Sequence, residues 1–136
     1  MRQILIDTGP LVALLDAGDR DHRRCVQVAK RLSGELVTTW PVLTEAVYLL
    51  ADTPKAQDAL LAKVEGGSVR IAMLEAGDAR EMRVLMRRYG DLPMDLADAS
   101  LVRVADREDI RQVFTLDRRD FGIYRTARGR PLAILP

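Results

Sequence analysis

The sequence has very little of the chemistry that cysteine, histidine and lysine supply. Its 136 residues include one cysteine, Cys25, and one histidine, His22. One cysteine cannot form a disulfide within the chain, and these two residues cannot complete a zinc site, which takes about four such ligands. Any metal ion that this chain binds is therefore expected to have oxygen ligands.

Long hydrophobic runs and a signal segment are also missing. The apolar stretch at residues 11–15 is far shorter than the roughly 20 residues that a membrane span needs, and the N-terminus does not lead into an export signal. We expect a cytoplasmic protein with no membrane partner.

Aromatic residues make up only 4% of the chain, which leaves few side chains on which RNA bases could stack. We expect the following four to be mainly packing residues: Trp40, Tyr48, Tyr89 and Tyr124.

Hydrophobic residues account for 48% of the sequence and charged residues for 30%, as is usual for a globular protein. The length suits one domain spanning residues 1–136. The net charge of +1 does not by itself indicate a nucleic-acid-binding protein. Arginine is nevertheless concentrated near the C-terminus, and its planar guanidinium suits phosphate. The cluster could equally be a solvated basic tail. Its residues are Arg118, Arg119, Arg125, Arg128 and Arg130.

Short apolar segments alternate with segments of helical periodicity along the whole chain. The first kind predicts strands at residues 3–6, 36–39, 69–74, 113–116 and 131–135. The second kind predicts helices at residues 11–16, 21–32, 41–50, 53–66, 78–89 and 95–107. This alternation predicts an α/β fold, a three-layer α/β/α sandwich around a mainly parallel sheet.

Acidic residues follow two of these predicted strands. Asp7 comes directly after the first strand and Asp117 after the fourth, and ligands of parallel sheets bind beyond the carboxyl ends of strands. The alternatives are structural, because Asp7 could cap a helix and Asp117 could belong to a turn or a surface ion pair.

Three more acids lie on predicted helices. Glu45 has mostly apolar neighbours one turn away, so its carboxylate is expected to be paired, protonated or bound to a cation. Asp95 and Asp98 share one side of a helix near its start, where Asp95 is placed to be the N-cap. Either could join a cluster with Asp7 and Glu45.

A cluster of carboxylates is stable only if something offsets the repulsion between them. A divalent cation does so, and oxygen ligands favour Mg²⁺ or Mn²⁺. Such an ion can activate water and stabilise charge on a phosphoryl oxygen, which makes phosphodiester hydrolysis the expected chemistry.

Four short motifs, in order, resemble those of PIN-domain nucleases, in particular the VapC-type toxins of type II toxin–antitoxin pairs. They are Ile6-Asp7-Thr8-Gly9, Pro41-Val42-Leu43-Thr44-Glu45, Asp98-Ala99-Ser100-Leu101 and the segment from Thr115 to Phe121. The resemblance covers nearly the whole chain.

The resemblance implies a PIN-like fold and an endoribonuclease that depends on Mg²⁺ or Mn²⁺. It also implies an RNA substrate, an antitoxin partner and a homodimer, for which helices 53–65 and 78–89 offer apolar residues. The catalytic and metal-binding quartet that it implies is Asp7, Glu45, Asp98 and Asp117. It further implies supporting roles for Thr8, Thr115 and Asp120. Asp95 departs from the family pattern, because it adds a carboxylate one turn before Asp98, so either could be the third ligand. We choose Asp98, since the Asp-Ala-Ser-Leu string carries the likeness, and keep Asp95 as a supporting residue. Among the C-terminal arginines, Arg118, Arg119 and Arg125 are the expected RNA contacts.

Two other functions are compatible with the sequence. The first is a catalytically silent module of the same fold that binds RNA or protein and whose acids are caps and ion pairs. The second is a phosphate-accepting aspartate domain. That class generally needs a lysine late in the chain, whereas the last lysine here is Lys63.

Overall fold

The structure, a computed structural model, describes residues 2–136, and within that range strands and helices alternate as predicted. The strands are β1 (Gln3–Ile6), β2 (Glu35–Thr38), β3 (Val69–Ile71), β4 (Gln112–Phe114) and β5 (Ala133–Leu135). The helices are α1 (Thr8–Leu15), α2 (His22–Arg31), α3 (Trp40–Leu49), α4 (Pro54–Glu65), α5 (Ala76–Arg88), α6 (Leu96–Glu108) and α7 (Arg118–Ile123).

The five strands form one sheet in the order β3-β2-β1-β4-β5, and every neighbouring pair is parallel. β1 is central, with Leu5 opposite Val37 of β2 on one side and opposite Val113 of β4 on the other. Ile4, Leu5 and Ile6 are all buried. A strand that is covered on both faces has a continuous run of apolar residues, which is why the sequence of residues 3–6 predicts a strand.

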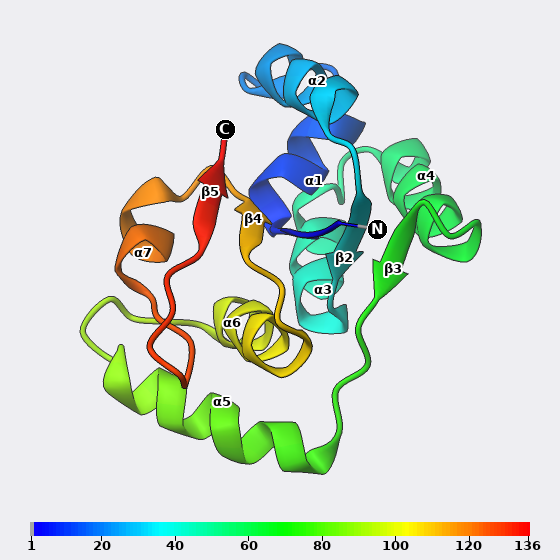
Figure 1. The fold of residues 1–136 in the computed structure, drawn as a ribbon. Coiled ribbons are helices and arrows are strands. Elements are labelled where there is room, and N and C mark those ends of the chain that lie inside the picture. The colour runs from blue at the N-terminus through cyan, green and yellow to red at the C-terminus, as the bar shows by residue number, and fades with distance from the viewer. Residues whose placement is uncertain (1) are drawn as a thin grey trace.

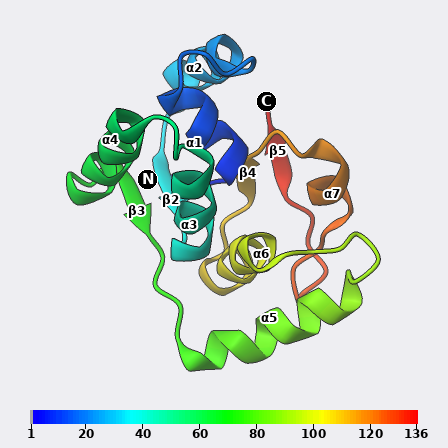
Figure 2. The same ribbon diagram turned by 180° about the vertical axis from the view of Figure 1, so that it is seen from behind.

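The helices cover both faces of the sheet. From β1 the chain first moves through β2 to β3 and then crosses to β4 and β5 on the other side. Because crossovers between parallel strands are right-handed, connections that run in opposite directions lie on opposite faces. Figures 1 and 2 accordingly show α1 to α4 on one side and α5 to α7 on the other. The predicted three-layer sandwich is confirmed.

The main departure from the prediction is α7, a six-residue helix that follows β4. Its sequence, Arg-Arg-Asp-Phe-Gly-Ile, has strongly charged residues and a glycine but only one buried side chain, Phe121. So short a helix has no amphipathic period to recognise, and most of its stability must come from its cap and from tertiary packing. A second difference is that α1 begins at Thr8 and not near Leu11.

The aromatic residues are only partly buried as expected. Tyr124 is fully buried, but 48% of Trp40 and 78% of Tyr48 are exposed, so the prediction that these two are packing residues is wrong.

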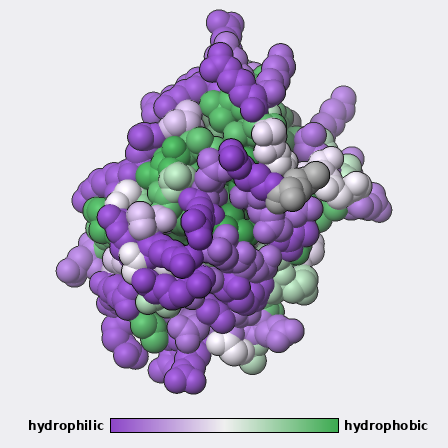
Figure 3. Space-filling model, in the orientation of Figure 1, coloured by the Kyte–Doolittle hydropathy of each residue, from purple (hydrophilic) through white to green (hydrophobic). Residues whose placement is uncertain are grey.

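Elsewhere the surface is more polar. In the view of Figure 3 it is mostly hydrophilic, with hydrophobic residues gathered mainly in the upper half around α1 and the C-terminal strand. Within residues 2–136, no helix has the length and apolarity that crossing a membrane requires.

Candidate active site

Acidic side chains gather where the strand order changes direction, between β1 and β4. Asp7 immediately follows β1, and Asp117 lies three residues after the end of β4. Such a switch point is where open α/β sheets bind ligands. An open pocket of about 470 Å³ lies here, and all four residues of the predicted quartet line it together with three of the predicted supporting residues. These seven are Asp7, Thr8, Glu45, Asp95, Asp98, Asp117 and Asp120.

Asp7 is the most deeply buried acid of the pocket, with 8% of its surface exposed. It occupies the N-cap position of α1, but its carboxylate makes no capping bond. Thr115 Oγ1 instead donates to Asp7 Oδ2 at 2.8 Å and accepts from the backbone N–H of Asp117 at 3.0 Å. Burial raises the pKa of Asp7 to about 6; the Thr115 bond opposes this shift, and the negative charge of Glu45 adds to it.

Glu45 is half-buried and reaches the pocket from α3. Pro41 lies in the first turn of this helix, where its missing N–H costs nothing. Thr8 Oγ1 donates to Glu45 Oε1 at 2.5 Å. Thr8 and Thr115 therefore each hold a carboxylate on another element, which is the supporting contact expected of them.

Asp95 and Asp98 have different surroundings at the start of α6. Asp95 is exposed and acts as the N-cap, because its Oδ1 accepts from the backbone N–H of Asp98 at 2.8 Å. The Asp98 carboxylate accepts from the Tyr124 hydroxyl at 2.8 Å. Burial raises the pKa of Asp98 to about 7, and the negative charge of Asp7 adds to this shift.

Asp117 caps the N-terminus of α7, since its Oδ1 accepts from the backbone N–H of Asp120 at 3.0 Å. Desolvation and the neighbouring charge of Asp117 raise the pKa of Asp120. Asp117 thus has a structural role as an N-cap, where the sequence suggested a turn or a surface ion pair, and it also lines the pocket.

No ion pair compensates these acids. In residues 2–136, none of the salt bridges involves an acidic residue of the pocket. Over the same residues, no three His, Cys, Asp or Glu side chains converge as a formed metal site. The Asp7, Glu45 and Asp98 carboxylates are instead hydrogen-bonded by hydroxyls. The pocket is therefore rich in oxygen ligands and lacks a counter-charge, which is what a hard divalent cation would supply.

The C-terminal arginines do not all lie near this pocket. Arg118 and Arg119 begin α7 beside Asp117 and are exposed, and Arg118 donates to the Pro136 carbonyl. Arg125 donates to the carbonyls of residues 122–124 at the end of α7. The other two pair with acids near the end of α6 furthest from Asp98: Arg128 with Asp106, and Arg130 with Asp109.

Tyr124 is the contributor that was not identified from the sequence. Its hydroxyl meets Asp98 across 26 residues, and no local spacing links the two. Its burial and its contact with Asp98 raise its pKa, so the phenol stays protonated and remains a donor. Only the packing of α7 against α6 reveals this role.

The fold and the acidic pocket agree with what sequence comparison finds. The family model described as "PIN domain" matches residues 4–129, and the chain belongs to this family.

One similar protein is Ribonuclease VapC26 of Mycobacterium tuberculosis, 31% identical over 135 residues, which cover 98% of this chain and 100% of that protein. Among solved structures, Mycobacterium tuberculosis VapC20, described as a Sarcin-Ricin loop cleaving toxin, superposes with a TM-score of 0.79 at 22% identity, over 85% of this chain and 91% of that one. A chain of a toxin–antitoxin complex from Klebsiella pneumoniae gives a TM-score of 0.70 at 17% identity, over 98% and 96% of the two chains. These structural likenesses establish the fold.

Proposed function

We propose that this protein is a metal-dependent endoribonuclease that hydrolyses RNA phosphodiester bonds and acts as the toxin of a toxin–antitoxin pair. The observation that carries the proposal is the pocket at the switch point, which is lined by acids from α3, α6 and the two strand ends. Within residues 2–136, none of these acids pairs with a basic side chain. The similarity of this chain to a protein named as a ribonuclease supports RNA as the substrate. One PIN-like domain, residues 1–136, is proposed to carry the activity.

The residues proposed to hold Mg²⁺ or Mn²⁺ are Asp7, Glu45, Asp98 and Asp117. When bound, such an ion lowers the pKa of water and stabilises charge on a phosphoryl oxygen. Thr8 and Thr115 orient Glu45 and Asp7 through the bonds described above. Asp95 fixes the start of α6, and Asp120 adds negative charge beside Asp117.

RNA is proposed to approach over the start of α7. Arg118 and Arg119 are exposed there and are proposed to contact phosphates, which position a strand without reading its bases. Arg118 would exchange its bond to the Pro136 carbonyl for a phosphate. Arg125 is the third proposed contact, and it would have to exchange its bonds to backbone carbonyls for a phosphate. Arg128 and Arg130 are not included, because acids already neutralise them at the other end of α6.

Two protein partners are proposed, an antitoxin and a second copy of the chain. The antitoxin is inferred from the toxin–antitoxin complexes among the structural relatives. For the homodimer, the strongest apolar face is that of Trp40, Tyr48, Leu49 and Leu96, which are 48–78% exposed. A groove of about 710 Å³ on this face shares Glu45 and Asp95 with the acidic pocket. This face is therefore a better candidate than α4 and α5, the helices favoured by the sequence.

The homodimer is tested by equilibrium sedimentation at micromolar concentration. We expect a dimer for the wild type and a monomer for Trp40→Ser. The substitution removes a large apolar side chain from this face, so the dimer interface would bury less apolar surface and be less stable. A wild type that is only monomeric contradicts the homodimer.

The catalytic proposal is tested by incubating the purified protein, free of any partner, with a structured RNA in Mg²⁺, Mn²⁺ or EDTA. Asp7→Asn and Asp98→Asn remove charge from the pocket. Asp106→Asn is the matched control, because it makes the same change on α6 outside the pocket, where Asp106 pairs with Arg128. We expect metal-dependent cleavage by the wild type and by Asp106→Asn, and none by the other two.

One outcome of this experiment would favour a catalytically silent binding module. RNA binding that EDTA does not affect, without cleavage in either metal, would mean that the hydroxyl-bonded acids form a structural cluster only. Cleavage retained by Asp7→Asn would place catalysis outside this pocket.

A further inference from the structure

Tyr124 occupies an unusual position, because it connects the two helices whose N-terminal ends carry Asp98 and Asp117, the last two acids of the quartet. It ends α7, the helix that Asp117 caps, and it reaches α6 through its bond to Asp98 Oδ2. This is the only side-chain hydrogen bond that the Asp98 carboxylate accepts within residues 2–136. The orientation of Asp98 therefore depends on this one phenol.

Two other aromatic rings pack against the Tyr124 ring. Tyr89 and Phe121 each pack edge-on against it, with ring centroids 5.1 Å away. The backbone is fixed as well, because Tyr124 N donates to the Asp120 carbonyl at 3.0 Å and the following N–H, of Arg125, donates to the Tyr89 hydroxyl at 2.9 Å. A fully buried ring with these contacts has one direction available for its hydroxyl.

Hydroxyl support is a shared feature of the pocket. Thr8 holds Glu45, Thr115 holds Asp7 and Tyr124 holds Asp98, and in each case donor and acceptor come from different elements. Each bond engages one carboxylate oxygen. Within residues 2–136, no other side chain donates a hydrogen bond to any of these three carboxylates.

We propose that Tyr124 is a positioning residue for the metal site, which orients Asp98 toward the cation and fixes α6 relative to α7. The inference rests on the proposed function. Tyr124 does not contact the ion or the RNA, and it acts through Asp98 alone. Partners that orient a metal-binding side chain in this way typically contribute about 10- to 100-fold in metal affinity or activity.

The test is Tyr124→Phe, which removes the hydroxyl and keeps the ring contacts. The chain offers a matched control, Tyr89→Phe, which removes the hydroxyl of the neighbouring ring and affects only the backbone contact with Arg125. The measurement is Mn²⁺ binding by isothermal titration calorimetry to each full-length protein, with thermal unfolding without metal to confirm that both variants are folded.

We expect Tyr124→Phe to bind Mn²⁺ about tenfold more weakly than the wild type, with Tyr89→Phe unchanged. RNA cleavage by Tyr124→Phe should recover as Mn²⁺ approaches saturation, while the KM for RNA stays at the wild-type value. A purely structural role for Tyr124 would not produce recovery by metal.

Equal Mn²⁺ affinity for the wild type and Tyr124→Phe overturns the inference and leaves the proposed function intact. A similar loss in Tyr89→Phe also overturns it, because the effect would then come from the aromatic packing. If the wild type binds no Mn²⁺, the proposed function fails and this inference fails with it.

Discussion

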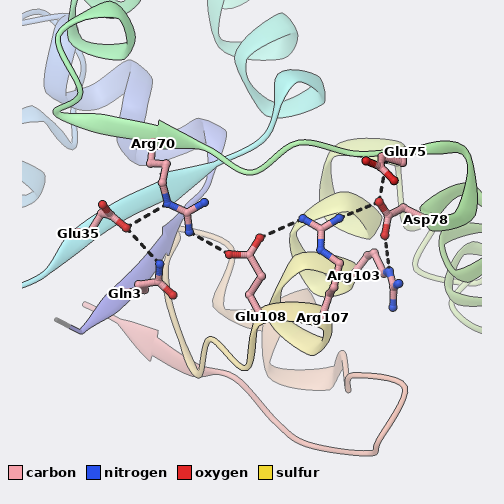
Figure 4. A network of polar contacts seen from close by, with 8 residues as sticks. All are labelled: Gln3, Glu35, Arg70, Glu75, Asp78, Arg103, Arg107 and Glu108. Carbon is pink, nitrogen blue, oxygen red and sulfur yellow. Dashed lines mark hydrogen bonds and ion pairs between the residues drawn. The ribbon is translucent and has the colours of Figure 1, made fainter.

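Two clusters of acidic residues in this protein differ in how their charge is compensated. In the acidic pocket, the carboxylates of Asp7, Glu45 and Asp98 accept from hydroxyls, and that of Asp117 accepts from a backbone N–H group. In the second cluster, centred on Asp78 of α5, the carboxylates of Asp78, Glu108 and Glu35 each meet an arginine (Figure 4). Both clusters contain aspartate and glutamate, but only in the second do arginines compensate their charge.

Asp78 is as buried as Asp7, with 4% of its surface exposed, yet its two oxygens accept from Arg103 Nε and Arg107 Nη1, each at 2.7 Å. Oδ2 also accepts from the backbone N–H of Glu75 at 2.8 Å. Burial alone would raise the pKa of Asp78, but these donors outweigh it and hold that pKa below its usual value. The pairs continue through Glu108 and Arg70 to Glu35.

The contrast separates a structural acid from a functional one. Burial with an arginine partner joins α5, α6 and the sheet, whereas burial without one leaves a charge that a ligand must compensate. The raised pKa values of Asp7 and Asp98 and the lowered pKa of Asp78 express the same difference.

The largest effect is expected from breaking the complete cluster. Asp78→Ala leaves Arg103 and Arg107 without their buried partner, and we expect the free energy of unfolding in urea to fall by about 3 kcal/mol. Mn²⁺ affinity of the folded protein should not change, because the pocket is untouched. A loss of stability as small as that of a surface pair would contradict the structural role of Asp78.

The second effect is on pH dependence without metal. Asp7 and Asp98 have raised pKa values of about 6 and about 7 when folded, so the stability they contribute is full below 3.8 and is lost as the pH rises through 6 and 7. Asp78 behaves oppositely, and its contribution is lost only below 3.8. The free energy of unfolding should therefore decrease from pH 5 to pH 8, on the order of 2 kcal/mol. Urea unfolding in EDTA that shows constant or rising stability over this range would contradict the assignment.

The third effect has the opposite sign to the first. Asp98→Asn removes an uncompensated charge but keeps an oxygen for Tyr124, so metal-free protein at pH 8 should gain about 1 kcal/mol. At pH 5, where Asp98 is protonated in the folded protein, the gain should be smaller, and it should disappear only below 3.8. Thermal unfolding of both proteins at the two pH values checks this, and equal changes at both would rule out relief of charge as the cause.

The smallest effect is expected for the pair that lies outside both clusters. Arg128 is half exposed and pairs with Asp106 at 3.1 Å. Arg128→Ala should change the free energy of unfolding by less than about 0.5 kcal/mol. It should also leave RNA cleavage unchanged, and reduced cleavage would mean that the RNA extends along α6.

The sequence predicted the fold well because its strands are continuous apolar runs in a parallel sheet. Once the strands are placed, Asp7 and Asp117 must share one edge, and their position around the pocket follows from topology. Their role as metal ligands remains a prediction. α7 is too short to show a period. The Tyr124 contact and the Asp78 cluster join residues distant in sequence, which no periodicity reveals. The exposure of Trp40 and Tyr48 was not predicted, because the sequence pattern of a helix does not distinguish an apolar residue that faces the core from one that faces an interface.

The central claim is that the pocket acids are held in place for a divalent cation. Its most direct test is thermal unfolding of the wild type, Asp7→Asn and Asp106→Asn near pH 7.5, with and without Mn²⁺. A ligand that binds only the folded state raises the melting temperature. We predict that Mn²⁺ raises it for the wild type and Asp106→Asn but not for Asp7→Asn. No shift in the wild type, or an equal shift in Asp7→Asn, would contradict the account.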